Sequence, residues 1–240
     1  MAAVIAGRAK GVYDDAGNSS TNVVTSAITT QATGSVFVLY VMRQDQNAIT
    51  VSDSKSNTYT EVVNVDNVFD GINVYTDIYI KIDGVGGSGH TWTINSASTN
   101  SYISAFAEEI TGADLAALLS AITSAGQNDA ASPFVDPGIT VGAETLLLAF
   151  ATAEAAVNTA FVPGNSFTLG DEYPNGAVHW EAAVANRYVT GSGTYNCTWT
   201  KTTAAEMNCL ILAIPSAVTG GAINTRTLTS SLRVLDRDIR

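Results

Sequence analysis

Short segments that alternate between apolar and polar residues recur along most of the chain. They are rich in Val, Ile, Thr, Tyr and Phe, and Gly, Asn, Asp and Ser cluster between them, which is typical of β-strands joined by turns. Apolar side chains at every second position indicate antiparallel strands with one buried face. The predicted strands are Asn22–Thr29, Ser35–Arg43, Ala48–Ser52, Thr58–Val65, Ile72–Ile82, His90–Asn95, Tyr102–Thr111, Thr145–Thr152, Ala177–Val189, Thr194–Lys201 and Met207–Ile214.

Three runs are almost continuously apolar: Val36–Met42, Leu146–Ala151 and Leu210–Ile214. Such runs suit central strands that are covered on both faces, although length alone does not separate them from buried helices. The Ala-rich stretch Glu144–Val157 is therefore compatible with a strand or a helix. One segment, Ala113–Ala125, has its leucines at helical spacing, and it is read either as a short helix or as a loop that crosses between sheets.

The regular spacing of strands, without alternating helices, indicates a β-sandwich or a barrel. We expect an all-β protein built as a single antiparallel β-sandwich, jelly-roll-like, over residues 20–216. Residues 1–19 are expected to form an extended N-terminal arm, and residues 217–240 a linker and a C-terminal tail. No repeat of 20–50 residues is evident, which argues against a solenoid or a propeller.

The composition changes after Pro215. Ser216–Ala222 is typical of a flexible link, and apolar residues then recur at the spacing of one face of a helix. A short isolated helix is marginal in water, so its apolar stripe needs a partner; a disordered tail and a strand added to a neighbour remain alternatives. The predicted docking residues are Leu228, Leu232, Arg233, Leu235, Arg237, Ile239 and Arg240.

The charge is distributed unevenly. Of 240 residues, 14% are charged and 46% are hydrophobic, which indicates a folded chain, and the net charge of −11 argues against binding to nucleic acid. Residues 226–240 carry a net charge of +2, whereas residues 1–225 carry −13. No apolar run approaches the ~20 residues that span a bilayer, and no secretory signal is recognisable, so we expect synthesis in the cytoplasm and no membrane partner.

The chain has two cysteines, Cys197 and Cys209. If their two strand-like segments formed a hairpin centred on Thr203, the cysteines would lie opposite each other and could form a disulfide. The alternative is a pair of buried thiols.

No motif for catalysis, a cofactor or a metal is evident. His90 and His179 lack a nucleophile motif nearby, and Glu108 and Glu109 are adjacent, so on a strand they point to opposite faces. We therefore expect no enzyme, no cofactor and no metal site. Trp92, Trp180 and Trp199 lie on predicted strands and keep a glycan-binding surface open as an alternative.

Several segments are similar to a group of β-sandwich domains in bacteriophage virion proteins and bacterial surface proteins. They include VSDSKSNTYTEV (Val51–Val62), AFAEEITG (Ala105–Gly112) and VTGSGTYNCTWT (Val189–Thr200). The resemblance covers roughly residues 35–216. It implies a jelly-roll-like sandwich used for display, decoration or attachment, with no catalytic residues.

These observations lead to a functional hypothesis. The chain is expected to be a non-enzymatic virion protein of the head decoration, collar or tail. Its partners would be other virion proteins in a homo-oligomeric assembly, reached through both termini. The alternative hypothesis is a glycan-binding adhesion module.

Overall fold

A computed structural model gives the fold of most of the chain. It describes residues 1–14, 20–44, 48–69, 72–100, 102–116, 124–129, 133–154, 160–173, 180–201 and 207–217. Within these residues the named elements are β-strands in antiparallel pairs. The all-β antiparallel sandwich class that the sequence pattern predicts is thus confirmed.

The strands fall into two halves, residues 1–112 and residues 113–217. The first half contains β1 (Val4–Asp14), β2 (Ser20–Val24), β3 (Ser35–Gln44), β4 (Ile49–Asp53), β5 (Thr60–Phe69), β6 (Ile72–Gly84), β7 (Trp92–Asn100) and β8 (Tyr102–Thr111). The second half contains β9 (Ser124–Asp129), β10 (Phe134–Val135), β11 (Ile139–Val141), β12 (Thr145–Glu154), β13 (Val162–Pro163), β14 (Thr168–Tyr173), β15 (Trp180–Val189), β16 (Gly193–Tyr195), β17 (Thr198–Thr200) and β18 (Met207–Pro215).

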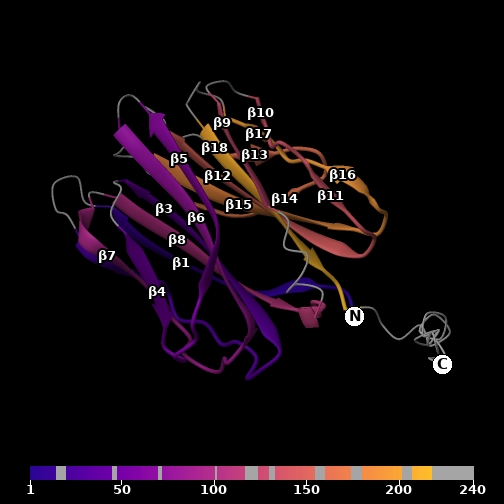
Figure 1. Ribbon diagram of the computed structural model, residues 1–240, viewed down its shortest axis with the longest axis horizontal. Helices are drawn as coiled ribbons and strands as arrows, with labels where there is room; N and C mark the ends of the chain where they lie inside the picture. Colours follow the sequence, from indigo (N-terminus) through magenta and orange to yellow (C-terminus); the bar gives the residue numbers. More distant parts are fainter. Residues whose placement is uncertain are drawn as a thin grey trace, which may run out of the picture.

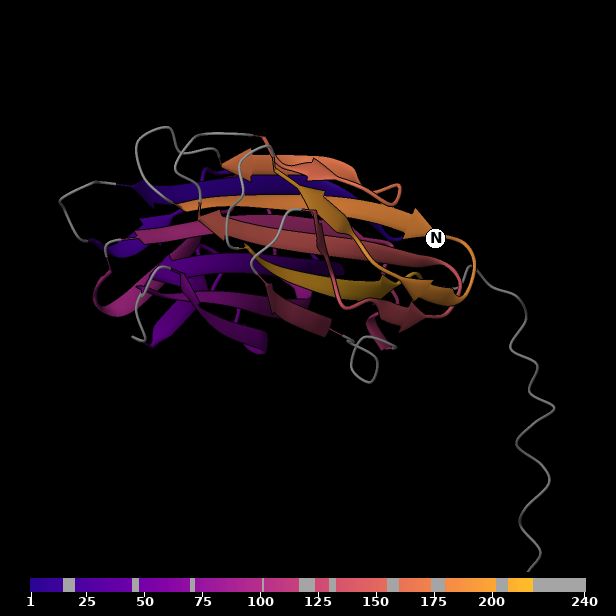
Figure 2. The same ribbon diagram turned by 90° about the horizontal axis from the view of Figure 1, so that it is seen from above.

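The described strands form four layers (Figure 1). The two inner sheets have the orders β1-β8-β3-β6-β5 and β14-β15-β12-β18-β9. The outer sheet β2-β7-β4 covers the first inner sheet, and the outer sheet β10-β17-β13 with the pair β11-β16 covers the second. Figure 2 shows the long strands of both halves running along the length of the body.

Three cores fill the spaces between the layers. The central core lies between the inner sheets, and a first and a second outer core lie between each inner sheet and its outer layer. In β3, Val38 and Tyr40 face the central core, while Phe37 and Leu39 face the first outer core. Both faces are buried because this strand lies in the middle of the stack, which explains its continuous apolar run.

The same holds for β12 and β18. Leu148 and Leu212 face the central core, and Leu147 and Ile211 face the second outer core. The interpretation of the three apolar runs as central strands is therefore confirmed. Full burial of each large side chain contributes about 1.5–3 kcal/mol, and an antiparallel strand places alternate side chains in two cores at once.

The two halves have the same strand order. Reading across the inner sheets, β1, β8, β3, β6 and β5 correspond to β9, β18, β12, β15 and β14. In the outer sheets β2, β7 and β4 correspond to β10, β17 and β13. The correspondence follows the chain order once β11 and β16 are set aside. The described body is therefore a structural repeat of one eight-stranded unit.

The strand register supports the repeat. In the first half Thr60 pairs with Ile80, and the register then shifts between Glu61 and Val63. In the second half Thr168 pairs with Asn186, and the register shifts in the same way between Leu169 and Asp171. β-bulges are frequent at sheet edges, but here they fall at the same place in corresponding edge strands, which supports the equivalence of the two halves.

Two short sequence matches accompany this structural repeat. Asn57-Thr58-Tyr59-Thr60 leads into β5, and Asn165-Ser166-Phe167-Thr168 leads into β14. Thr91-Trp92-Thr93 lies at β7, and Thr198-Trp199-Thr200 forms β17. Each Trp follows a Gly-Ser-Gly sequence. The spacing between this sequence and the Trp is three residues longer in the second half than in the first.

Equivalent parts of the two halves contact each other, as they would around a twofold axis. The rings of Tyr40 and Phe150, which occupy the same place in β3 and β12, lie 5.0 Å apart between centroids. The segments that follow β8 and β18 pair with each other through Ala113 and Ser216. Two further bonds run from the Ala217 N–H to the Gly112 carbonyl (2.8 Å) and from the Asp114 N–H to the Pro215 carbonyl (2.9 Å).

Two expectations need correction. Residues 1–19 were expected to be an extended arm, but Val4–Asp14 forms β1, which pairs with β8 at the edge of an inner sheet. The Gly and charged residues in β1 weaken its apolar pattern, so it does not read as a strand. The proposed helix Ala113–Ala125 is wrong at its end, because Ser124–Asp129 forms β9; its residues 117–123 lie outside the described residues.

Candidate functional site

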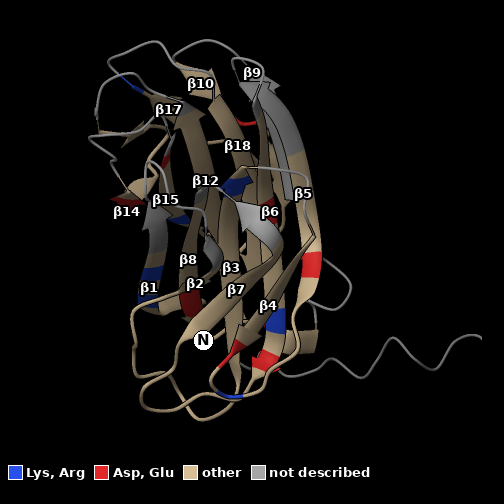
Figure 3. Ribbon diagram, turned by 90° about the vertical axis from the view of Figure 1, so that its left-hand side faces the viewer, with Lys and Arg blue, Asp and Glu red and all other residues tan. Residues whose placement is uncertain are grey.

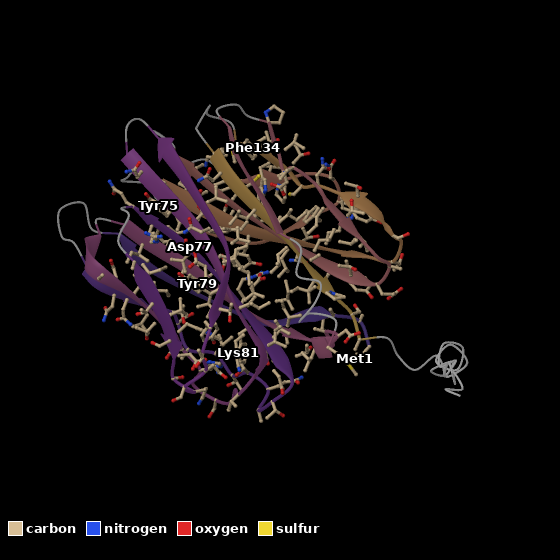
Figure 4. The ribbon with its side chains drawn as sticks, in the orientation of Figure 1. Met1, Tyr75, Asp77, Tyr79, Lys81 and Phe134 are labelled. Carbon is tan, nitrogen blue, oxygen red and sulfur yellow. The ribbon has the colours of Figure 1, made fainter. Side chains whose placement is uncertain are left out.

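Both ends of the described body lie at one pole, which we call the terminal pole. The Met1 amino group donates to the Ala217 carbonyl (2.6 Å), and the Ala3 N–H donates to the Ser216 Oγ (2.8 Å). The Ser216 N–H in turn donates to the Glu144 carbonyl (2.8 Å). Figure 4 shows Met1 at this end, away from the stripe Tyr75, Asp77, Tyr79 and Lys81 along β6. Ala217, the last residue that the structure describes, thus lies beside the first residues, and we call this point the exit.

A hollow of about 360 Å³ lies next to this exit. It is formed where β1 of the first half meets β12 and β15 of the second half. Its volume falls at the small end of the ~300–1,000 Å³ range of ligand pockets. Its lining residues are Ala3, Val4, Ile5, Arg8, Leu146, Asn186 and Tyr188.

Two of the polar groups in the hollow are fixed by partners. The Arg8 Nε donates to Glu108 Oε1 at 2.8 Å, and the Tyr188 hydroxyl donates to Glu144 and accepts from the Ser216 hydroxyl. Burial raises the pKa of Glu108, and the Arg8 guanidinium opposes that rise. The hydrogen bond to Glu144 raises the pKa of Tyr188. The shape of the hollow is therefore set by bonds within the body.

Arg8 also ties the two halves together at this seam. Its guanidinium lies over the bulge of β14, where a Cβ on Gly170 would fall 2.3 Å from Arg8 Nη2. Only glycine leaves room for this approach. Nearby, Lys10 Nζ lies 2.9 Å from Asp171 Oδ1; this pair is exposed and contributes little by itself.

The predicted docking residues lie outside the described residues. This applies to all seven: Leu228, Leu232, Arg233, Leu235, Arg237, Ile239 and Arg240. The prediction that they bind a partner rests on the sequence and on the place where the chain leaves the body.

Of the two alternatives for Cys197 and Cys209, the structure shows the pair of buried thiols. They form no disulfide, and both lie in the second outer core. The expected hairpin does not form, because β17 belongs to an outer sheet and β18 to an inner sheet. Cys209 instead pairs with Ala151 and Gln127 on the strands beside it.

Two of the three tryptophans do not form the glycan platforms that the sequence left open as an alternative. Trp92 and Trp199 are completely buried, one in each outer core. The side chain of Trp180 lies outside the described residues. A sugar needs an exposed aromatic face to stack on, so Trp92 and Trp199 are structural.

A buried polar network surrounds His90. Its Nε2 lies 2.9 Å from Asp53 Oδ2, and its Nδ1 lies 2.9 Å from Thr30 Oγ1. The Tyr59 hydroxyl donates to Asp53 Oδ2 (2.7 Å) and accepts from the Trp92 Nε1 (2.6 Å). Sequence analysis did not identify this network, because its members are spread over sixty positions and meet only when β4 pairs with β7.

The side chains of this network are not accessible to a substrate. Burial alone would raise the pKa of Asp53, but hydrogen bonds from Asn57, Tyr59 and His90 outweigh it and lower the pKa. A carboxylate, an imidazole and a hydroxyl in series are the parts of a hydrolytic triad. Here the side chains of Asp53 and His90 are both 0% exposed, and Trp92 stacks on the imidazole at 4.0 Å. The network therefore holds the outer sheet in place.

A different arrangement occupies the equivalent place in the second half. Cys197 corresponds to His90, and its carbonyl accepts from the Asp136 N–H (3.0 Å). Burial raises the pKa of the Asp136 carboxyl to about 7, although hydrogen bonds from the Cys209 side chain and the Cys197 backbone lower it. Burial, followed by the charge of Asp136, raises the pKa of the Cys197 thiol. A thiol that stays protonated is a poor nucleophile.

The carboxylates follow the expected geometry. Glu108 bonds to Tyr40 on the central-core side, and Glu109 accepts from the Ser35 hydroxyl at 2.6 Å on the opposite face. The prediction that adjacent carboxylates point apart is confirmed. Glu181 forms a buried ion pair with Lys201.

Two further observations concern only the part of the chain that the structure describes. No three His, Cys, Asp or Glu side chains gather there to hold a metal ion. No helix there is long and apolar enough to cross a membrane.

In comparisons with known proteins, no family model, no curated protein and no solved structure matches this chain.

Proposed function

We propose that this chain is a non-enzymatic structural protein of a bacteriophage virion, associated with the head, collar or tail. It assembles with other virion proteins through the segment 217–240, which we call the C-terminal segment. The observation that carries the proposal is the convergence of both ends at the terminal pole. A rigid four-layer body with one exit point suits a subunit that is attached at one end and displays the other.

The strand order supports the proposal by analogy. In an eight-stranded jelly roll the first, eighth, third and sixth strands share one sheet, and the second, seventh and fourth share the other. Each half of this body has that order, with β5 and β14 joined to the inner sheets. Jelly rolls occur in viral capsid and lectin domains, although a fold alone does not define a function.

The corrected N-terminus changes how assembly would work. Because Val4–Asp14 is part of an inner sheet, it is not free to reach a neighbouring subunit. The C-terminal segment alone is left as the attaching element. Its net basic charge contrasts with the acidic body, so it would approach an acidic partner surface with less repulsion.

The proposal is tested by locating the protein in purified phage particles. We expect quantitative mass spectrometry to find it at a fixed number of copies per particle, and a variant lacking residues 225–240 to be absent. A protein found only in the cell lysate, or a truncated chain incorporated at the full level, would contradict the proposal.

A glycan-binding adhesion module is the second candidate, and one observation favours it. The outward face of β2-β7-β4 carries mainly Asn, Thr and Ser side chains and, among the described residues, no charged one; β7 contains no Lys, Arg, Asp or Glu and is tan in Figure 3. Hydroxyl and amide groups can hydrogen-bond to neutral sugars. The outward residues are Asn22, Val24, Thr50, Ser52, Thr93 and Asn95. A glycan array without hits would remove this candidate.

A further inference from the structure

The hollow at the terminal pole is lined in part by exposed apolar side chains that nothing in the described body covers. Val4, on β1, is 49% exposed although it is a large apolar residue, and the partly exposed Ile5 lines the hollow with it, together with the buried Ala3 and Leu146. Apolar side chains that line a concave site gain free energy when another apolar group displaces water from them. The fixed positions of Arg8 and Tyr188 mean that the site is formed before any occupant arrives.

We infer that this hollow receives apolar side chains from the C-terminal segment of a second copy of this chain. The inference rests on the proposed function, because it names the partner of the same segment. The segment carries Leu228, Leu232, Leu235 and Ile239 at a spacing that places them on one face. A hollow of this size takes one or two such side chains, as a pocket takes an anchoring residue.

The length of the segment allows it to reach a second copy. Leu228 comes 11 residues after Ala217, so the link can carry it at most about 36 Å from the exit. The 13 residues of β6 span about 43 Å. A link of this length can span most of a body, so the apolar stripe can reach the hollow of a neighbouring copy.

The charges at the terminal pole are compatible with this occupant. Glu144 and Asp114 lie beside the exit, and the C-terminal segment contains Arg226, Arg233 and Arg237. Opposite charges at the edge of an apolar contact set its orientation and speed its formation. Without the segment, two bodies that each carry excess negative charge would repel one another.

The first experiment measures association by sedimentation equilibrium of the full chain and four variants. Val4→Glu places a charge in the hollow, and Val24→Glu is its matched control, since Val24 is a β-strand valine with 52% exposure on an outer sheet. The other two are a chain ending at Ala217 and the double variant Leu232→Glu/Leu235→Glu. We expect association to weaken at least about tenfold in all but the control.

A mixing experiment separates loss of binding from loss of folding. The Val4→Glu chain keeps its C-terminal segment, and the chain ending at Ala217 keeps its hollow. Each alone is expected to be monomeric, whereas the mixture is expected to form a heterodimer. A misfolded variant does not give this result, and association of the parent chain distinguishes docking between copies from docking within one chain.

The remaining outcomes overturn the inference. It fails if the mixture stays monomeric while the parent associates, or if Val24→Glu weakens association as much as Val4→Glu. It also fails if the parent is monomeric, including the case in which the segment folds onto its own hollow. None of these results affects incorporation into particles, so the proposed function is judged separately.

Discussion

The two halves of the body share a backbone plan but differ in what fills their outer cores. Around Trp92 the first half has Asp53, Tyr59 and His90, joined by hydrogen bonds. The equivalent residues around Trp199 are Pro163, Phe167 and Cys197. Around the tryptophan, the same sandwich therefore forms with a polar network or with apolar neighbours.

This difference changes the hydrogen bonding of the second tryptophan, Trp199. Trp92 Nε1 donates to the Tyr59 hydroxyl, whereas Trp199 Nε1 has no hydrogen-bond partner among the described residues. Phe167 lacks the hydroxyl that would accept this bond. A buried polar group is stabilising only if its partners are complete, so the first half depends on its network in a way that the second half does not.

Removing the centre of the first network should have the largest effect. Asp53→Ala leaves His90 and Tyr59 buried without their common acceptor, and we expect it to lower the free energy of unfolding by about 3–5 kcal/mol. Urea denaturation measures the change. The control is Pro163→Ala at the equivalent place, which should cost less than about 1 kcal/mol. Equal losses would show that the network has no special role.

The pH dependence should have opposite signs in the two halves. The raised pKa of Asp136 means that the folded state holds its proton from about pH 4 to about pH 7, where the unfolded carboxyl has lost it. Stability falls with rising pH across this window. Asp53 has a lowered pKa, so its contribution is present at neutral pH and is lost only as the pH falls through its folded pKa.

Asp136→Asn tests the second half. We expect the free energy of unfolding of the variant, relative to the parent, to rise by about 2–4 kcal/mol between pH 4 and pH 8. Because the variant and the parent are compared at both pH values, any pH-independent effect of the Asn side chain on the free energy of unfolding cancels. A difference that does not change with pH would mean that the carboxyl ionises freely in the folded state.

A reciprocal exchange at the tryptophans should have a smaller effect. Tyr59→Phe leaves Trp92 Nε1 unpaired and should cost about 1–3 kcal/mol. Phe167→Tyr supplies an acceptor to Trp199 and should stabilise by up to about 1 kcal/mol. Chemical denaturation of both variants and of the double exchange gives the comparison. A loss in both variants would show that the second core has no space for a hydroxyl.

The comparison also shows what the sequence could and could not predict. The central strands were predictable because Val36–Met42 and Leu210–Ile214 are buried on two faces and leave continuous apolar runs. The repeat was not, because Trp92 and Trp199 lie 107 positions apart and the insertions between them shift the alignment. The network around His90 was not predictable from a repeat either, because the residues at the equivalent positions differ between the halves.

The errors share a physical cause. The hairpin that would join Cys197 and Cys209 assumes that consecutive strands pair, but here the chain crosses from an outer to an inner sheet. Strand β1 was missed because an edge strand with one buried face carries polar residues such as Lys10. Local patterning predicts strands, whereas the choice of partner depends on contacts between distant segments.

The smallest effect is expected from rearranging the order of the halves. The Met1 amino group lies 2.6 Å from the Ala217 carbonyl, and residues 113–123 separate the two halves in the sequence. A chain without residues 218–240, joined from Ala217 to Met1 by a short glycine link and opened at residues 117–123, should keep its stability within about 1 kcal/mol.

A second opening site is the control for this rearranged chain. Opening the chain at Val85–Gly87 cuts within the first half and removes bonds from Val85 N–H to Asn57 and from Gly87 N–H to Thr30. We expect the second rearranged chain to lose at least about 2 kcal/mol more than the first. Thermal and urea denaturation compare the two. If both lose the same stability, the boundary at residues 113–123 is no more tolerant than any loop, and the two halves are then equivalent in topology without being separate folding units.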